Sequence, residues 1–248
     1  ENACTDIIVN SAPAITVSIT YTTGNVGSYA AVVANTAGGT PSNYIRGTIP
    51  AMSALTVSGW VNFQTVSTSG TVPNTVFSIG TSSQTFLFLY YVNGTGLQFQ
   101  FLNSSSATVT VGTRASINTA TWYNFVIIYN QTGTCYFYLN NVLVGSVSGA
   151  ALLSTMTRYS IGSYCHAAYG AFNGYIDDLR IYNSAVTWYD ASAIFTQGNC
   201  VAGNSRIGAT VSDSQIVLTS GALDVSSDSY YNTGYTEMSA TIQSQTLT

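Results

Sequence analysis

The chain has 248 residues, enough for one large domain or for one domain with an appendage. Only 6% of the residues are charged, and the five basic ones include no lysine. So few cations cannot neutralise many phosphate groups, which argues against nucleic acid and anionic membrane surfaces as partners. No apolar run reaches the roughly 18 residues that a membrane-spanning helix needs, so we also expect no membrane insertion.

Short strands follow one another through most of the chain. Residues 15–22 alternate strictly between apolar and polar side chains, which predicts a half-buried strand. Turn residues separate further runs of strand type at 29–33, 55–63, 76–80, 85–92, 97–101, 107–111, 121–129, 135–139, 142–147 and 159–164. No segment with helical periodicity interrupts this series, so the pattern predicts an all-β sandwich of two antiparallel sheets.

Residues 172–183 carry the most specific pattern, Phe-Asn-Gly-Tyr-Ile-Asp-Asp-Leu-Arg-Ile-Tyr-Asn. Strand alternation places Asp177 on one face and its neighbour Asp178, together with Arg180, on the other. The face of Asp177 is otherwise apolar, with Tyr175, Leu179 and Ile181. We therefore expect Asp178 and Arg180 to pair at the surface, and Asp177 to need a partner of its own.

The chain changes character after this stretch. Thr187-Trp188-Tyr189-Asp190 has the form of a capping box, which predicts one short helix near 188–196. Residues 201–248 are richer in acidic residues and contain further strand-like runs. We expect a domain at 1–200 and a C-terminal β-rich extension at 201–248, which supplies extra strands or a strand between subunits.

The stretch 172–183 resembles the last core strand of laminin-G-like, concanavalin A-like lectin domains. Other landmarks of that family follow in the expected order: Asn43-Tyr44-Ile45, residues 55–61, residues 122–126, residues 136–141 and Ser160-Ile161-Gly162. The likeness covers about residues 15–198. It implies a jelly-roll sandwich.

The resemblance bears on Asp177, because some members of the family hold a structural calcium ion near this aspartate. Acidic partners early in this chain are limited to Glu1 and Asp6. We expect backbone hydrogen bonds to satisfy Asp177, with calcium as the alternative, and we expect no other cofactor.

The resemblance also raises the question of enzymatic activity, because the glucanases of this fold cleave with a carboxylate pair on one strand. No Asp or Glu occurs between Asp6 and Asp177, and Asp177 and Asp178 are predicted to face opposite ways. The single histidine, His166, has no pattern around it that indicates a catalytic base. We therefore predict that the chain is not an enzyme.

Four cysteines allow three pairings. We expect Cys4 to pair with Cys200 and Cys135 with Cys165; the alternative is four free buried thiols. Their spacing is not that of a zinc site. Disulfides would indicate an oxidising compartment.

Three sequons are candidates for N-glycosylation: Asn93, Asn103 and Asn130. Glu1 is not a starting methionine and no signal-peptide pattern follows it, so we expect a processed chain. Together with the cysteines, these features predict a secreted, extracellular glycoprotein.

Two functions fit these observations. The first is a non-enzymatic structural subunit of an extracellular fibre or surface assembly. The surface has few of the charges that normally keep sheet edges apart, and the extension could add a strand to a neighbouring copy. The alternative is that the extension packs on its own domain. The partner would then be the protein itself, as a homo-oligomer or fibre.

The alternative is a carbohydrate-binding, lectin-like or adhesion module with glycans as partners. The three tryptophans, Trp60, Trp122 and Trp188, stand at family core or helix-start positions, so we expect them to be buried rather than stacked on sugar. Tyrosines that could stack include Tyr164, Tyr169, Tyr230 and Tyr231, but the sequence singles out no cluster.

Overall fold

Two antiparallel sheets of seven strands each form the fold in a computed structural model, which confirms the predicted all-β jelly-roll sandwich. The structure describes residues 15–17, 19–26, 29–103, 105–150, 156–167, 169–182, 184–185 and 195. Sheet A contains, in spatial order, β1 (Ile15–Val17), β4 (Tyr44–Thr48), β13 (Arg158–Ile161), β6 (Asn74–Gly80), β7 (Thr85–Val92), β8 (Gly96–Leu102) and β9 (Thr108–Arg114). Sheet B contains β12 (Val142–Ser148), β11 (Thr134–Leu139), β10 (Trp122–Tyr129), β5 (Leu55–Phe63), β14 (Gly174–Tyr182), β3 (Ala30–Val33) and β2 (Thr20–Thr22).

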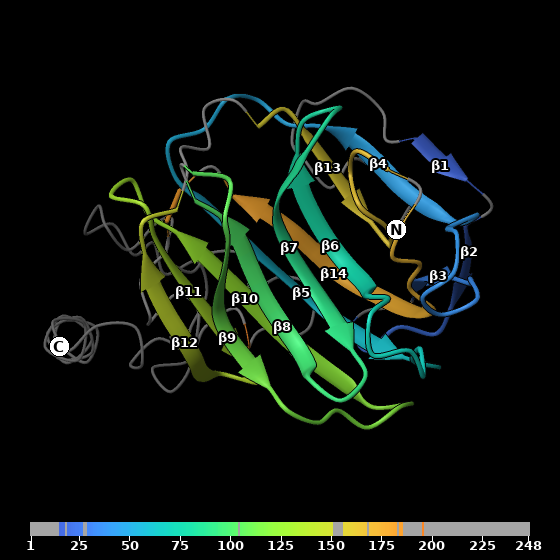
Figure 1. The fold of residues 1–248 in the computed structure, drawn as a ribbon. Coiled ribbons are helices and arrows are strands. Elements are labelled where there is room, and N and C mark those ends of the chain that lie inside the picture. Colours follow the sequence, from blue (N-terminus) through green and yellow to red (C-terminus); the bar gives the residue numbers. More distant parts are fainter. Residues whose placement is uncertain are drawn as a thin grey trace, which may run out of the picture. The chain divides into compact units, whose positions relative to one another are not determined.

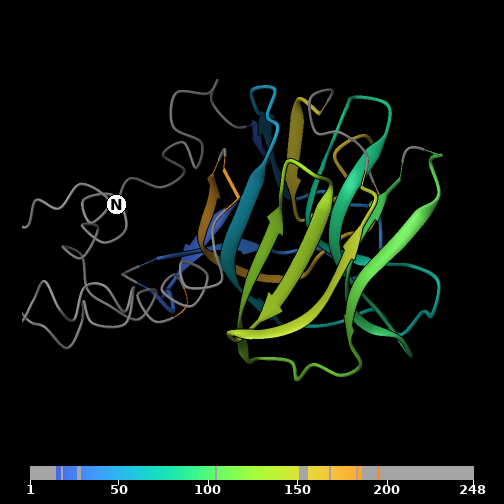
Figure 2. The same cartoon turned by 90° about the vertical axis from the view of Figure 1, so that its left-hand side faces the viewer.

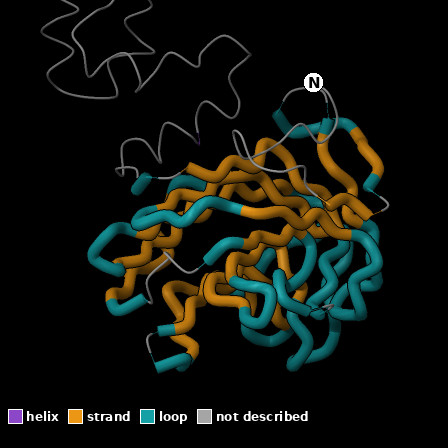
Figure 3. The backbone as a smooth tube through the Cα atoms, turned by 90° about the horizontal axis from the view of Figure 1, so that it is seen from above, coloured by secondary structure: helices purple, strands orange, loops and turns teal. Residues whose placement is uncertain are grey.

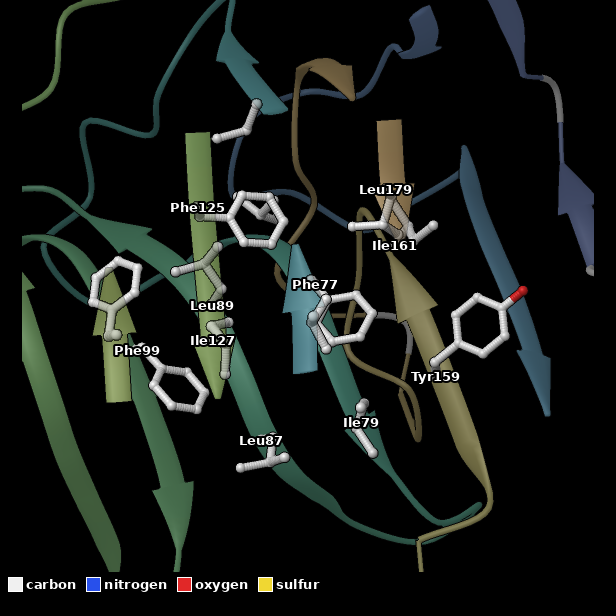
Figure 4. Packing of buried hydrophobic residues seen from close by; sticks show 14 of the residues in the cluster. Phe77, Ile79, Leu87, Leu89, Phe99, Phe125, Ile127, Tyr159, Ile161 and Leu179 are labelled. Carbon is white, nitrogen blue, oxygen red and sulfur yellow. The ribbon is translucent and has the colours of Figure 1, made fainter. Parts of the chain in front are cut away.

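The core fills the space between the sheets. Figure 1 shows β7 and β8 of sheet A passing in front of β14, β5 and β10 of sheet B, and the view turned by a quarter shows the two layers from the side (Figure 2). From above, loops join the strands at the ends of both layers (Figure 3). Leu89 and Phe99 from sheet A gather with Phe125 and Ile127 from sheet B (Figure 4), and each is at most 2% exposed. Each such side chain contributes about 1.5–3 kcal/mol by leaving water.

One predicted strand is two strands. The alternating run 15–22 splits into β1, which pairs with β4 in sheet A, and β2, which pairs with β3 in sheet B. Alternation reports only that one face is apolar, so it cannot distinguish one long strand from two short ones that cross between sheets.

The sequence did not predict β4 as a strand. Ile45 faces the core, and the next inward position is Gly47 rather than an apolar side chain. A Cβ atom at Gly47 would lie 2.6 Å from the hydroxyl oxygen of Tyr159 on β13. The large Tyr159 ring therefore occupies the space that an apolar residue would fill, and the alternation that reveals strands is hidden.

A β-bulge interrupts β14 and corrects the predicted alternation. Asp177 pairs with Trp60 and Arg180 with Ser58, so Asp178 and Leu179 together stand opposite Gly59. Asp178 has a positive φ of 43°. The extra residue turns Leu179 into the core, where a Cβ atom at Gly59 would lie 3.0 Å from its side chain. Asp177 and Leu179 thus lie on different faces, not on the one face predicted.

The β9 and β12 edges of the two sheets close against each other. A Cβ atom at Gly145 of β12 would overlap the carbonyl oxygen of Val111, and one at Gly112 of β9 would lie 3.0 Å from a methyl group of Val144. Both strands contain a register shift near this contact. Two edges that would otherwise be free are therefore covered by backbone contact.

The chain divides into two units, Glu1–Ala185 and Val186–Thr248. All described strands belong to the first. The predicted helix near 188–196 falls on residues of which the structure describes Phe195 alone, and its backbone is helical. The predicted extension 201–248 lies outside the described residues. In the described part of the chain, no helix has the length and apolarity required to cross a membrane.

Candidate functional site

The segment between β13 and β14, residues 162–173, passes over the outer face of sheet A at Tyr164 and returns to the core at Phe172. Gly162 opens this β13–β14 loop with a φ of 84°, and its N–H donates to the carbonyl of Val76 at 3.0 Å. Gly170, with a φ of 75°, accepts from the N–H of Thr75 at 2.8 Å. Both glycines adopt the left-handed region that other residues rarely enter, and together they anchor the loop to β6.

Five rings form an aromatic cluster where this loop meets β7. Phe88 and Tyr90 point outward from β7, with ring centroids 5.3 Å apart. Tyr164 from the loop lies 5.7 Å from Phe88, 6.0 Å from His166 and 5.4 Å from Tyr169. Tyr169 is 40% exposed, whereas Phe88 and Tyr90 are each 8% exposed. The cluster therefore has a buried base on the sheet and an exposed rim on the loop.

Burial disfavours the charged forms of Tyr90, Tyr164 and His166 in the cluster. Burial raises the pKa of Tyr90 to about 12 and also raises the pKa of Tyr164. Partial burial, with help from the charge of Arg46, lowers the pKa of His166. The Nδ1 atom of His166 lies 2.7 Å from Oγ1 of Thr85, within hydrogen-bond distance. Phenol hydroxyls and an uncharged imidazole can both donate and accept hydrogen bonds.

A row of amides and hydroxyls continues from the cluster across β8 and β9. The hydroxyl of Tyr90 donates to Oε1 of Gln98 at 2.8 Å, and Nε2 of Gln98 donates to Oγ1 of Thr113 at 2.9 Å. In the same way, Nε2 of Gln100 donates to Oγ1 of Thr110 at 2.8 Å. These bonds fix the orientation of two side-chain amides beside the aromatic rings.

Arg46 of β4 borders the cluster on its other side. Its Nη2 atom donates to the carbonyl of Tyr164 at 2.8 Å and reaches the hydroxyl of Ser163 at 3.4 Å. Its guanidinium carbon lies 4.7 Å from the ring centroid of Tyr44, a cation–π distance. Burial lowers the pKa of Arg46, and the nearby charge of Arg158 acts in the same direction.

Asp177, the aspartate whose partner the sequence left open, is bound by backbone donors. Its Oδ2 atom accepts from the N–H groups of Asn25 at 2.6 Å and Val26 at 2.7 Å, and its Oδ1 atom accepts from the N–H of Asp178 at 2.8 Å. Burial raises the pKa of Asp177, although these three bonds oppose the shift. These contacts agree with the expectation that backbone hydrogen bonds satisfy Asp177. No group of metal-binding side chains is found among the described residues, while Glu1 and Asp6 lie outside them.

Asp178 pairs with Arg180, with an Nε–Oδ1 distance of 2.7 Å. Asp177 and Asp178 are the two carboxylates of the described residues, and both are engaged. The described part of the chain therefore offers no free acid and base for glycoside hydrolysis. Absence of enzymatic activity stays a prediction.

The predicted disulfide between Cys135 and Cys165 is corrected. Both are free, buried thiols. Cys135 lies on β11 of sheet B, whereas the sulfur of Cys165 lies 3.2 Å from Oγ1 of Thr85 at sheet A. The two cysteines belong to different layers, which sequence spacing cannot reveal. Cys4 and Cys200 lie outside the described residues.

The three sequons stand at turns. Asn93 is exposed, and its amide donates to the carbonyl of Thr68 at 2.7 Å. Asn103 and Asn130 are half-buried, and each accepts from backbone N–H groups of the turn that follows it. Their glycosylation stays a prediction.

The aromatic residues singled out in the sequence differ in burial and in position. Trp60 is 6% exposed, as predicted. Trp122 is half-buried, with its ring 6.3 Å from that of Tyr175, and Trp188 lies outside the described residues. Tyr164 and Tyr169 come together in the cluster, whereas Tyr230 and Tyr231 lie outside the described part. Sequence reasoning missed four residues of the site: Phe88, Tyr90, Gln98 and Gln100.

A signal for the site was present in β7. Its sequence, Thr-Phe-Leu-Phe-Leu-Tyr-Tyr-Val, is apolar at consecutive positions. A strand with one solvated face should alternate, so aromatic residues on the outward face indicate that something covers or binds it.

The sequence of this chain matches a known protein family. A family profile described as the concanavalin A-like lectin/glucanases superfamily matches residues 37–192. The chain belongs to this superfamily. No curated protein shows a significant match.

Several solved structures share the superfamily fold with this chain. Domain 4 of AbnA, a GH43 extracellular arabinanase from Geobacillus stearothermophilus solved with arabinotriose, has a TM-score of 0.57 and 21% identity, over 77% of this chain and 90% of that one. A heptameric SAP-like pentraxin from Limulus polyphemus has a TM-score of 0.51 and 18% identity, over 61% and 75%. The binding domain of botulinum neurotoxin DC, solved with SialylT, has a TM-score of 0.56 and 12% identity, over 75% and 46%. At these identities the likeness concerns the fold.

Proposed function

We propose that this chain is a carbohydrate-binding module whose ligand lies on the outer face of sheet A, against the aromatic cluster. The observation that carries this proposal is the exposed ring of Tyr169, which packs on Tyr164, and Tyr164 in turn packs on Phe88. An exposed aromatic ring offers a rigid apolar surface to the C–H face of a sugar, and its support holds it in place at low entropic cost.

The polar row supplies the second requirement of a sugar site. Saccharide hydroxyls need donors and acceptors in fixed positions, and the amides of Gln98 and Gln100 are oriented by their bonds to Tyr90, Thr113 and Thr110. Because the pKa of Tyr90 is raised to about 12, its phenol keeps its proton at neutral pH and remains a donor.

Two of the similar structures are complexes with a ligand. The arabinanase domain is bound to arabinotriose, and the neurotoxin domain to SialylT. These relatives support carbohydrate as the ligand class of the proposal. They say nothing of which saccharide this chain would take.

The proposed function also fits a secreted glycoprotein or an adhesion module. A carbohydrate-binding module that is secreted and glycosylated would meet its ligand outside the cell, and an adhesion role would follow if the ligand lay on another cell. The subunit of a fibre or surface assembly remains a separate prediction, because it depends on residues 201–248, which lie outside the described residues.

Substitution of Tyr169 tests the proposal. The purified chain is first screened on an array of neutral and acidic glycans, and the affinity of the best glycan is then measured by calorimetry. Tyr169→Ala should weaken binding by roughly tenfold, because a stacked ring contributes on the order of 1.4 kcal/mol. The same substitution should leave thermal unfolding nearly unchanged, since this side chain is 40% exposed.

Tyr29 provides the matched control, because it is also an exposed tyrosine, 56% exposed, but stands next to β3 in sheet B. Tyr29→Ala should bind glycan as the unmodified chain does. Array signals no higher than background for every glycan would reject the carbohydrate-binding function, and equal losses in both variants would move the site away from the cluster.

A further inference from the structure

We infer that the saccharide bound on this face carries an acidic group, a carboxylate or a sulfate, which Arg46 and Arg158 hold together. The inference rests on the proposed function, since both arginines border the same β13–β14 loop that carries the aromatic cluster. It adds a chemical class to the ligand and two residues to the site.

The two arginines are neighbours on one face. In the pairing of β4 with β13, Arg46 stands opposite Ser160 and Arg158 stands opposite Thr48. The pair between them is Gly47 and Tyr159, and the side chain of Tyr159 belongs to the core. Arg46 and Arg158 therefore both point outward as a diagonal cross-strand pair, about 7–8 Å apart at the backbone.

In the described part of the chain, the groups that bond to these two charges are neutral. Arg46 bonds to a carbonyl and a hydroxyl of the loop, and Nη1 of Arg158 lies 3.5 Å from the carbonyl of Cys165. The Nε atom of Arg46 is buried and has no hydrogen-bond partner among the described residues. Two like charges at this separation repel each other, and a buried donor without an acceptor is costly. An anion placed between them would relieve both.

The described part of the chain contains no carboxylate that could serve as that anion. Its two acidic residues are Asp177, which is bound by three backbone N–H groups, and Asp178, which is paired with Arg180. No ion pair with a described residue is found for Arg46 or Arg158. In a protein with 6% charged residues, two adjacent cations without a counter-ion among the described residues favour a counter-ion that comes with the ligand.

Guanidinium groups suit this role. They offer paired N–H donors that match the two oxygens of a carboxylate or sulfate, and charge-assisted bonds of this kind are stronger than neutral ones. Arg46 is already oriented by Tyr44 and Tyr164. A sugar ring on Tyr169 and Tyr164 would present its acidic substituent toward this pair.

Matched glycans test the inference. The intact chain is screened on an array that contains uronate, sialate and sulfate saccharides, each beside its neutral counterpart, and oligogalacturonate is compared with its methyl ester by calorimetry. We expect at least about tenfold tighter binding of the acidic member of a pair. Arg46→Gln and Arg158→Gln should each remove most of that preference, and higher salt should weaken it. The uronate, sialate and sulfate rows identify the acidic group.

Arg114→Gln is the control, because it removes the same charge from β9 at the far edge of the same sheet. It should retain acidic-glycan binding; a loss equal to that of Arg158→Gln would overturn the inference and indicate a general charge effect.

Equal binding of neutral and acidic members would overturn the inference and leave the proposed function standing. Binding of no glycan would overturn both. Arg158→Gln is the decisive variant if Arg46→Gln unfolds, because Arg158 has the weaker bond to the loop, and its folding is checked by thermal unfolding.

Discussion

The carboxylate of Asp177 shows how one residue can join parts of the chain that are distant in sequence. It stands on β14 and binds the N–H groups of Asn25 and Val26 between β2 and β3. These donors belong to the turn of a hairpin whose outer strand is only three residues long. Asp177 therefore stabilises the sheet edge through the turn rather than through strand pairing.

Removing this acceptor should destabilise the fold. Asp177→Ala removes the acceptor of three backbone N–H groups, those of Asn25, Val26 and Asp178, and we expect the free energy of unfolding to fall by about 1–3 kcal/mol. Asp177→Asn keeps an acceptor oxygen and should lose less. Urea unfolding measures both; an alanine variant as stable as the unmodified chain would contradict the role assigned to this carboxylate.

The same residue makes stability depend on pH. Because the pKa of Asp177 in the folded state is raised above its ordinary value of 3.8, the folded chain binds its proton more tightly than the unfolded chain does. The contribution of Asp177 to the free energy of unfolding should therefore be full below pH 3.8 and decline as the pH rises through the raised pKa. Asp177→Asn should lack this decline in the same unfolding series.

At the scale of elements, the β13–β14 loop positions the aromatic cluster, and its first anchor is Gly162. A Cβ atom at Gly162 would lie 2.6 Å from a methyl group of Val33, across the sandwich in sheet B. Gly94, in the β7–β8 hairpin turn, has nearly the same φ, 80° against 84°, but nothing within 4 Å of a Cβ atom. An alanine would therefore strain the backbone at both positions, but it would overlap a neighbouring side chain only at Gly162.

Alanine at these positions should therefore have unequal effects. Gly94→Ala should cost about 1–2 kcal/mol, from the left-handed backbone alone. Gly162→Ala should cost more, by roughly 1–3 kcal/mol, because a methyl group must also displace Val33 in the core. Chemical unfolding of both variants measures the difference; equal costs would show that the core accommodates the methyl group without strain.

Strand alternation predicted most elements within two residues of their bounds, because it depends on neighbouring side chains alone. Residues 55–63 and 85–92 coincide with β5 and β7. Prediction failed where a long-range contact replaced the local pattern. Gly47 makes room for Tyr159, and the bulge at Asp178 lets Leu179 cover Gly59.

At the scale of the whole molecule, the order of strands in sheet A decides the site. The loop after β13 lies over β6 and β7, so Tyr164 contacts Phe88, which is far away in the sequence. The same order places β4 beside β13 and brings Arg46 next to Arg158. A local pattern in any one strand contains neither contact.

The prediction of self-assembly concerns the full chain and has its own test. The sequence predicts that residues 201–248 mediate contacts between copies. Light scattering should then give a larger particle mass for the full chain than for one that ends at residue 200. A full chain that stays monomeric at every concentration would reject the assembly prediction, and it would leave the carbohydrate-binding proposal untouched.

The sequence by itself determined the all-β class, the positions of most strands and the superfamily, because alternation and turn residues are local and the motif at 172–183 is contiguous. It also established the scarcity of charge. Only the tertiary structure decided that Cys135 and Cys165 lie in different layers, that Asp177 binds a distant turn, and that rings from β7 and the β13–β14 loop form one cluster. Those facts depend on which strands become neighbours, and pairing across a sandwich is set by the packing of the whole core.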